Sequence, residues 1–278
     1  MQAPLRKAAV AGSWYPGEAE DLASEVEGYV RAAGQHTIPG RLVALISPHA
    51  GLRYSGPVAA HGYGLLRGRS SLRVVLVGPS HHMAFPGSSV FARGAFETPF
   101  GRIPIDEDVA ARLIAADPGI VDESSAHRSE HSLEMQLPFL QHAVGELRIV
   151  PVLMGNQARE DVDSLASALV SALESEDILL VASSDLSHYH PAAKANSLDA
   201  RVVEDVEKFD AGALMSRLED YHGHACGGGP MVAVMKAARG LGADTSTILK
   251  YADSGDAGDR DKSRVVGYLS AALSARDA

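Results

Sequence analysis

The chain has 278 residues, a length at which a packed core needs no disulfide or metal to hold it together. Its net charge of −10 argues against binding to nucleic acid, which requires a basic surface facing the phosphates. With one cysteine, Cys226, and no apolar run near the roughly 20 residues of a membrane span, we expect a cytoplasmic protein without membrane contact.

Short runs of Val, Ile and Leu alternate along the chain with segments of helical periodicity. Strands buried on both faces are predicted at 42–47, 73–78, 148–154 and 177–182. Helices are predicted at 19–33, 56–66, 106–116, 160–174, 191–207, 210–221 and 230–241. Two late runs, 246–251 and 264–273, are expected to close the sheet as strands, although the alanine-rich end of the second is equally compatible with a helix.

This alternation of strand and helix predicts an α/β fold with a mostly parallel or mixed central sheet flanked by helices. No linker rich in Pro, Gly and Ser divides the chain, so we expect one domain over residues 1–278. The acidic, glycine-rich segment 253–263 lacks the spacing of a calcium loop and is predicted as an ordinary loop.

Histidines follow three of the predicted strands at the point where each strand ends. The stretches are LVALISPHAG (42–51), VVLVGPSHHM (74–83) and DILLVASSDLSHYH (177–190). In open α/β sheets, ligands bind outside the carboxyl ends of the parallel strands. We therefore expect the three histidine clusters to converge on one site.

The spacing within these clusters suggests which side chains face that site. His81 and His82 are adjacent, and adjacent side chains of an extended chain point to opposite sides, so one of them is expected to face inward. Asp185 and His188 are three residues apart, which suits the first turn of a helix. Asp185 would then either orient an imidazole or serve as a helix N-cap.

Cys226 lies in the stretch YHGHACGGGPM, just before a predicted helix. A thiol beside a helix N-terminus has a lowered pKa and more of the thiolate that binds metal or attacks carbon. The alternative is a small buried apolar residue, the common situation of a free cysteine. The three glycines after Cys226 favour function, because glycine lets the backbone approach a ligand closely.

The segment HRSEHSLEMQLPFL (127–140) is a further candidate. If it is helical, His131 and Glu134 lie on one face, where they would line a pocket or remain solvated. The segment does not contain the HExxH pattern of zinc proteases. P-loop, GxGxxG and GxSxG patterns do not occur either, so nucleotide-binding and esterase functions lack their best signals.

Two imidazoles from neighbouring strand ends and one thiolate would form a three-ligand metal site with open positions. Structural zinc sites normally have four protein ligands, whereas catalytic sites keep a position for water or substrate. This donor set is softer than two histidines and one carboxylate, and it suits zinc, copper(I) or iron(II).

The sequence resembles the Memo family, which includes protein B of the AmmeMemoRadiSam system. The matching stretches run in order through nearly the whole chain: AGSWYP (11–16), PHAGLRYSG (48–56), VGPSHH (77–82), EHSLEMQLPFL (130–140), IVPVLMG (149–155), SSDLSHY (183–189) and ACGGGP (225–230). The resemblance implies an αβ sandwich similar to the class III extradiol ring-cleaving dioxygenases, which contain non-haem iron.

By this resemblance, the metal ligands of the family fall on His49, His81 and Cys226. The histidine that acts as acid and base in the dioxygenases corresponds to His188, with Asp185 beside it. The dioxygenases carry Glu where this chain has Cys226, and a thiolate is softer and more easily oxidised. Iron(II) is the first candidate for a mononuclear metal, with copper and zinc as alternatives. Four further residues are expected to line the pocket: Trp14, His82, His131 and Glu134.

Three functions follow from these observations. The first is a metal-dependent redox or dioxygenase-like protein that acts on a small substrate. The second is an adaptor that binds metal or a peptide without turnover. The third is a hydrolase with Cys226 as nucleophile. The expected partners are a small molecule or a peptide, and the resemblance implies a functional link to the radical enzyme of the AmmeMemoRadiSam system. The metal, the substrate and the oligomeric state are not encoded in any pattern that we recognise.

Overall fold

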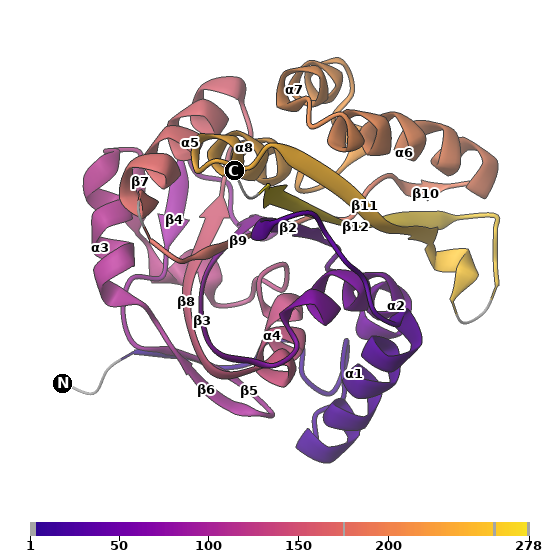
Figure 1. The fold of residues 1–278 in the computed structure, drawn as a ribbon, viewed down its shortest axis with the longest axis horizontal. Coiled ribbons are helices and arrows are strands. Elements are labelled where there is room, and N and C mark those ends of the chain that lie inside the picture. The colour runs from indigo at the N-terminus through magenta and orange to yellow at the C-terminus, as the bar shows by residue number, and fades with distance from the viewer. Residues whose placement is uncertain (1–3, 175, 258–259, 277–278) are drawn as a thin grey trace.

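In the computed structural model, which describes residues 4–174, 176–257 and 260–276, a nine-stranded sheet lies between layers of helices (Figure 1). Its strand order is β10–β12–β2–β9–β3–β8–β4–β7, and β11 pairs with β12. The strands are β2 (Arg41–Ser47), β3 (Arg69–Pro79), β4 (Ser88–Val90), β7 (Ile120–Asp122), β8 (Val144–Met154), β9 (Leu179–Ser183), β10 (His188–His190), β11 (Thr245–Asp253) and β12 (Val265–Ala275). The expected α/β class with a mixed sheet is confirmed.

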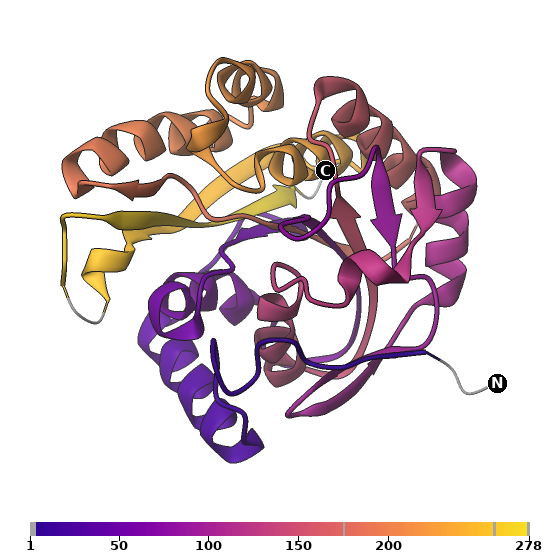
Figure 2. The same cartoon turned by 180° about the vertical axis from the view of Figure 1, so that it is seen from behind.

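The helices cover both faces of this sheet. They are α1 (Ala19–Ala33), α2 (Leu52–Tyr63), α3 (Glu107–Ala116), α4 (Leu137–Ala143), α5 (Arg159–Leu173), α6 (Ala192–Glu207), α7 (Ala211–Asp220) and α8 (Gly228–Gly240). Helices α1, α2 and α4 pack together on one face, and α5 and α8 pack against each other on the other. Figure 2 shows the same two layers from behind, with α1 and α2 in indigo and purple opposite the orange α6 and α7.

The centre of the sheet consists of the four parallel strands β2, β9, β3 and β8. These strands are the continuous apolar runs of the sequence, and their side chains are buried because helices cover both faces. Strand β12 extends the sheet by antiparallel pairing with β2 and β11. Its alanine-rich end is strand rather than helix, since Ala271 and Ala272 pair with Ile46 and Leu45 in the middle of the sheet.

Most of the long helices and strands lie where the sequence predicts them. Helix α1 has the predicted bounds, whereas α2 begins four residues before its predicted start, directly after Gly51. The short elements were not predicted from the sequence. They include a three-stranded sheet of order β1–β5–β6, which consists of β1 (Leu5–Arg6), β5 (Ala95–Thr98) and β6 (Gly101–Pro104). Elements of two to four residues are too short to show a hydrophobic period.

Short 3₁₀ turns connect several of these elements: Gly64–Leu66, Ser124–His127, Glu134–Gln136, His222–His224 and Ser254–Asp256. The predicted loop 253–263 therefore contains one such turn, while its residues 258 and 259 lie outside the described part.

The segment expected to begin a helix at Asp185 is extended instead, because His188–His190 pairs with β12 as β10. No helix within the described ranges is long and apolar enough to span a membrane.

Candidate metal centre

Three adjacent parallel strands place polar side chains at one edge of the sheet. His49 lies two residues beyond the end of β2, His81 two beyond β3, and Asp185 two beyond β9. Strand β9 lies between β2 and β3, so the three strand ends are neighbours. The carboxyl ends of parallel strands meet at one edge, which is the physical reason for the convergence expected from the sequence.

Cys226 reaches the same edge from the start of α8. Its backbone N–H donates to the carbonyl oxygen of Asp185 over 3.2 Å. Gly227 permits this approach, because a Cβ there would lie 2.3 Å from the Ser183 carbonyl oxygen. The glycine therefore brings the backbone close to the end of β9 rather than to a ligand, and this close packing fixes the thiol beside the histidines.

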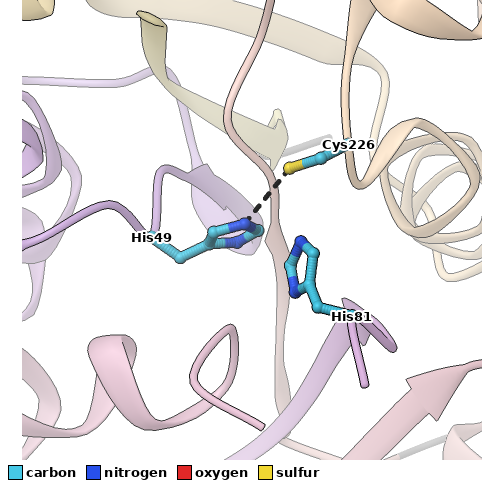
Figure 3. Close-up of side chains that lie close together, drawn as sticks. All are labelled: His49, His81 and Cys226. Atoms are coloured by element: carbon cyan, nitrogen blue, oxygen red, sulfur yellow. Dashed lines mark hydrogen bonds between the residues drawn. The ribbon is translucent and has the colours of Figure 1, made fainter. Parts of the chain in front are cut away.

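The ligand atoms of His49, His81 and Cys226 all lie within 4.8 Å of one another. The shortest separation, 3.1 Å, joins Sγ of Cys226 to Nε2 of His49. Figure 3 shows the two imidazole rings and the thiol facing a common point, with this contact dashed. His49 is 2% exposed, Cys226 is half-buried and His81 is exposed, so the site runs from the buried end of β2 to the surface of the hollow.

A buried hydrogen-bond network fixes which nitrogen of His49 is free. The hydroxyl of Ser183 donates to the carbonyl of Ser132 over 2.7 Å and accepts from the amide of Gln136 over 2.8 Å. Because that hydroxyl has only one proton, its 2.8 Å contact with Nδ1 of His49 requires Nδ1–H to donate. Nε2 of His49 therefore carries a lone pair towards Cys226. Burial also lowers the pKa of His49 well below its usual value, which keeps the ring neutral.

Glu130 has the corresponding role for His81. One carboxylate oxygen accepts from Nδ1 of His81 over 2.9 Å, and the other accepts from the backbone N–H of His81 over 2.6 Å. The backbone N–H of Ser132 adds a third bond to the carboxylate. These donors hold the pKa of Glu130 well below its usual range despite burial. With Nδ1 committed to Glu130, Nε2 of His81 is the nitrogen left for a ligand.

A second group of candidate ligands, His81, Glu130 and His131, also lies within 4.8 Å. Both oxygens of Glu130 are already occupied by protein donors, so this carboxylate is better suited to orienting His81 than to binding an ion. The ring of His131 stacks on His81 with centroids 4.6 Å apart and contacts the ring of Trp14 at a tilt, with centroids 4.3 Å apart. Burial lowers the pKa of His131 to about 4, so it forms a neutral wall of the site.

A cavity of about 460 Å³, which we name the metal pocket, opens above these groups. This volume is within the range of small-molecule sites. Its lining consists of Trp14, His49, Ala50, Gly51, His81, His131, Asp185, His188, Tyr189, Cys226 and Val266. The structure thus brings together the three ligand candidates with four other residues named from the sequence.

Two expected pocket residues lie elsewhere. His82 is exposed beside His81 and touches the cluster only through an edge contact with His131, with centroids 6.1 Å apart. Glu134 is fully buried and ion-paired with Arg6, and it accepts from the hydroxyl of Tyr15 over 2.6 Å. The shared helical face expected for His131 and Glu134 does not form, because His131 precedes the turn at Ser132 and Leu133 and the 3₁₀ helix begins only at Glu134.

Asp185 and His188 do not form the expected pair. Asp185 accepts from the backbone N–H groups of His49 and Ala50 over 2.7 and 3.3 Å. The Nδ1 of His188 instead bonds the carbonyl oxygen of Leu186 over 2.8 Å, which leaves Nε2 free. Asp185 thus anchors the backbone that carries His49, and burial raises the pKa of its carboxyl to about 7.

The lowered pKa expected for Cys226 is wrong for the protein without a bound ion. Burial raises the pKa of the thiol strongly, and the neighbouring Asp185 raises it further. Hydrogen bonds with the Asp185 backbone, the Ser184 side chain and the Gly227 backbone at the start of α8 lower the pKa but are the smaller effect. Desolvation therefore outweighs the helix N-terminus here, and the thiol needs a cation beside it to ionise.

The orienting residues Ser183, Gln136 and Glu130 were not predicted as part of the site. Each lies inside a stretch that carries the family resemblance, but nothing in a single sequence separates an orienting polar residue from a solvated one. The position of Ser183 in the chain could have indicated its role, because it ends a buried strand two residues before Asp185. A polar side chain there must find buried partners.

Comparison with known proteins shows the family of the chain. Residues 6–272 match the family described as Memo-like protein. A MEMO1 family protein of Methanobrevibacter smithii is 38% identical over 96% of this chain and 98% of its own length. Relatives with the same description from Methanopyrus kandleri and Methanothermobacter thermautotrophicus are 36% and 35% identical, each over 95% of this chain and over 96% and 98% of their own lengths.

Proposed function

The chain belongs to the Memo family, and we propose that it is a metal-dependent redox protein acting on a small organic substrate. A single metal ion would be held by His49, His81 and Cys226 at the base of the metal pocket. The observation that carries this proposal is the common orientation of three donors: both histidines have Nδ1 bound to the protein, so both present Nε2 beside the thiol.

The donor set fits a transition metal. Two neutral imidazoles and one thiolate are ligands for iron(II), copper and zinc, and three protein ligands leave positions open. The buried orienting groups Ser183 and Glu130 match the partners that metal-binding histidines usually have. We propose iron(II) first, with copper and zinc as the alternatives.

The metal would supply Lewis acidity and electron transfer at its open positions. Around it, the chain's own residues bind and orient the substrate. Nε2 of His188 is free within the pocket, and burial lowers the pKa of this imidazole, so it is a neutral base that can accept a proton from the substrate. The rings of Trp14 and His131 contact each other and form one wall of the pocket.

The test is metal analysis of anaerobically purified protein, loaded in turn with iron(II), copper(I) and zinc. We expect about one ion per chain in the wild type and large losses in His49→Ala and Cys226→Ser. His82→Ala is the matched control, because this neighbour of His81 lies outside the pocket. Full metal content in Cys226→Ser would contradict the proposed ligand set, and circular dichroism would establish that the variants fold.

A second candidate is a protein that binds metal or a peptide without turnover. Two exposed aromatic side chains favour it: Trp14 and Tyr189, 39% and 63% exposed, line the pocket and offer apolar surface to a larger ligand. Oxygen uptake by the iron-loaded protein, without and then with catechols, separates the two functions. Tight metal binding with no uptake would favour the binding protein.

The 3.1 Å contact between Cys226 and His49 also has the geometry of a nucleophile and its base. Alkylation by iodoacetamide distinguishes this third function, because a thiolate bound to metal is protected. We expect metal loading to slow alkylation of Cys226, which is the sole cysteine. Alkylation at the same rate with and without metal would favour a hydrolase.

A further inference from the structure

A second hollow of about 300 Å³ adjoins the metal pocket, and we name it the arginine hollow. Arg260, Arg264, Tyr54, Tyr189, Tyr268 and Ser254 line it. The two cavities share Ala50, Tyr189 and Val266 in their linings, so they are contiguous. A small molecule that extends out of the metal pocket past Tyr189 therefore enters the arginine hollow.

The charges of this hollow differ from those of the chain as a whole. In a chain of net charge −10, two guanidinium groups meet there. Within the described ranges, neither Arg260 nor Arg264 has an ion-pair partner. One carboxylate, that of Asp261, also lines the hollow, and it accepts from the backbone N–H of Ser263 over 2.8 Å. Among the described residues, two cations against one such carboxylate leave a net positive lining.

Arg264 is arranged to receive a planar anion. Its guanidinium carbon lies 5.3 Å from the ring centroid of Tyr189, so the aromatic ring supports the guanidinium. This contact needs none of the five N–H donors of the guanidinium, which remain free for two parallel bonds to a carboxylate or phosphate. Lysine could not provide this combination of stacking and paired donors.

The backbone around the hollow is strained. Tyr189 and Arg260 have φ values of 60° and 54°, and they are two of the three non-glycine residues with positive φ in the described part of the chain. Such conformations cost free energy and persist where the surrounding structure holds them, often at ligand sites. Here they occur at the residue that separates the two cavities and at one of the two arginines.

We propose that the arginine hollow binds an anionic group, a carboxylate or a phosphate, of the small molecule whose other end occupies the metal pocket. The inference deepens the proposed function, on which it rests for the statement that the far end is the reacting one. It narrows the substrate class to acidic molecules long enough to pass Tyr189. The net charge of the chain would otherwise repel such molecules, so the two arginines also select for them.

The test measures dissociation constants in metal-free protein by ligand-observed NMR, with benzoate, phenyl phosphate and the neutral benzamide as probes. We expect at least one anion to bind about tenfold more tightly than benzamide. The variant with both Arg260→Gln and Arg264→Gln should lose this preference. Arg102→Gln is the control, since this exposed arginine belongs to β6 in the other sheet. Whichever anion binds more tightly identifies the group.

Equal binding of all three probes to the wild type, or an unchanged preference in the double variant, would overturn the proposal. Two further measurements separate it from the proposed function. Metal content in the double arginine variant should equal that of the wild type, and the anion preference should persist in Cys226→Ser. If the protein prefers anions but binds no metal, only the anion site in the arginine hollow is supported. If it binds metal but shows no preference for anions, only the metal centre is supported.

Discussion

Glu130 and Glu134 are four residues apart in one segment, and both are buried, yet they stabilise different parts of the molecule. Glu130 accepts from the backbone and the ring of His81 and so orients one of the proposed metal ligands. Glu134 binds the N-terminal segment: it pairs with Arg6 and accepts from the backbone N–H groups of Ala9 and Val10. Glu130 therefore orients the candidate site, whereas Glu134 stabilises the fold.

The two regions are joined by Arg6. Its guanidinium donates to the carboxylate of Glu134, to the carbonyl of Glu130, and to the carbonyl of His127 over 3.0 Å. Glu134 and the N-terminal segment that it binds, which we call the anchoring region, therefore support the backbone from which Glu130 reaches His81. Burial and residue type alone therefore do not identify a functional carboxylate; its hydrogen-bond partner does.

The largest expected effect is that of Glu134→Gln on stability. Removing this charge leaves the guanidinium of Arg6 buried without its counter-ion, so we expect a loss of about 3–5 kcal/mol in the free energy of unfolding. Urea denaturation measures it. The folded fraction should still bind metal, because Glu134 does not line the metal pocket. A variant as stable as the wild type would remove the distinction between the two carboxylates.

The anchoring region should also make stability depend on pH. Burial lowers the pKa of His127 to about 3, whereas an unfolded chain would protonate it near 6.5. Between these values the unfolded state binds more protons, so this residue's contribution is complete above pH 6.5 and falls by about 1.4 kcal/mol per pH unit as pH decreases towards 3. His127→Gln should show a shallower loss of stability between pH 6 and pH 4. Equal slopes would show that His127 is protonated in the fold.

Glu130→Gln should act mainly on the site. An amide keeps the shape but weakens the bond to Nδ1 of His81, so we expect metal affinity to fall about 10- to 100-fold. Competition with a chromogenic chelator measures the affinity. The paired readout is urea denaturation, in which Glu130→Gln should lose less stability than Glu134→Gln. The opposite order would exchange the roles assigned to the two residues.

Ser183→Ala has the smallest expected effect. The hydroxyl accepts a hydrogen bond from Nδ1–H of His49, and its loss frees that ring to change tautomer or rotate. We expect metal affinity to fall by about tenfold, at the low end of the effect of such orienting partners. Ser274→Ala is a matched control, because this serine is also buried in the sheet, in β12, and does not line the metal pocket. Equal effects in both variants would contradict the role of Ser183.

The strands and their polarity could be predicted from the sequence because β2, β3, β8 and β9 are buried on both faces and read as continuous apolar runs. Polarity then placed His49 and His81 at one edge without any knowledge of the strand order. Cys226 arrives from a distant part of the chain, so strand polarity could not place it. The glycines after it made it a candidate ligand, and the family resemblance assigned it to the expected metal site.

The orienting bonds could not be predicted, because they depend on side-chain partners far apart in sequence. Glu130 contacts His81 across 49 residues, and Ser183 contacts His49 across 134. The pairing of Asp185 with His188 was expected from helical spacing, but the strand β10 overrides that local preference by pairing with β12. The arginine hollow lies partly in a segment predicted as an ordinary loop, where composition alone shows no function.

The most direct test of the metal centre is X-ray absorption spectroscopy of the zinc-loaded protein. We predict one sulfur ligand at about 2.3 Å and two imidazole nitrogens at about 2.0–2.1 Å, with the sulfur signal absent in Cys226→Ser. A shell of nitrogen and oxygen alone in the wild type would contradict the account, because it would place the ion away from Cys226.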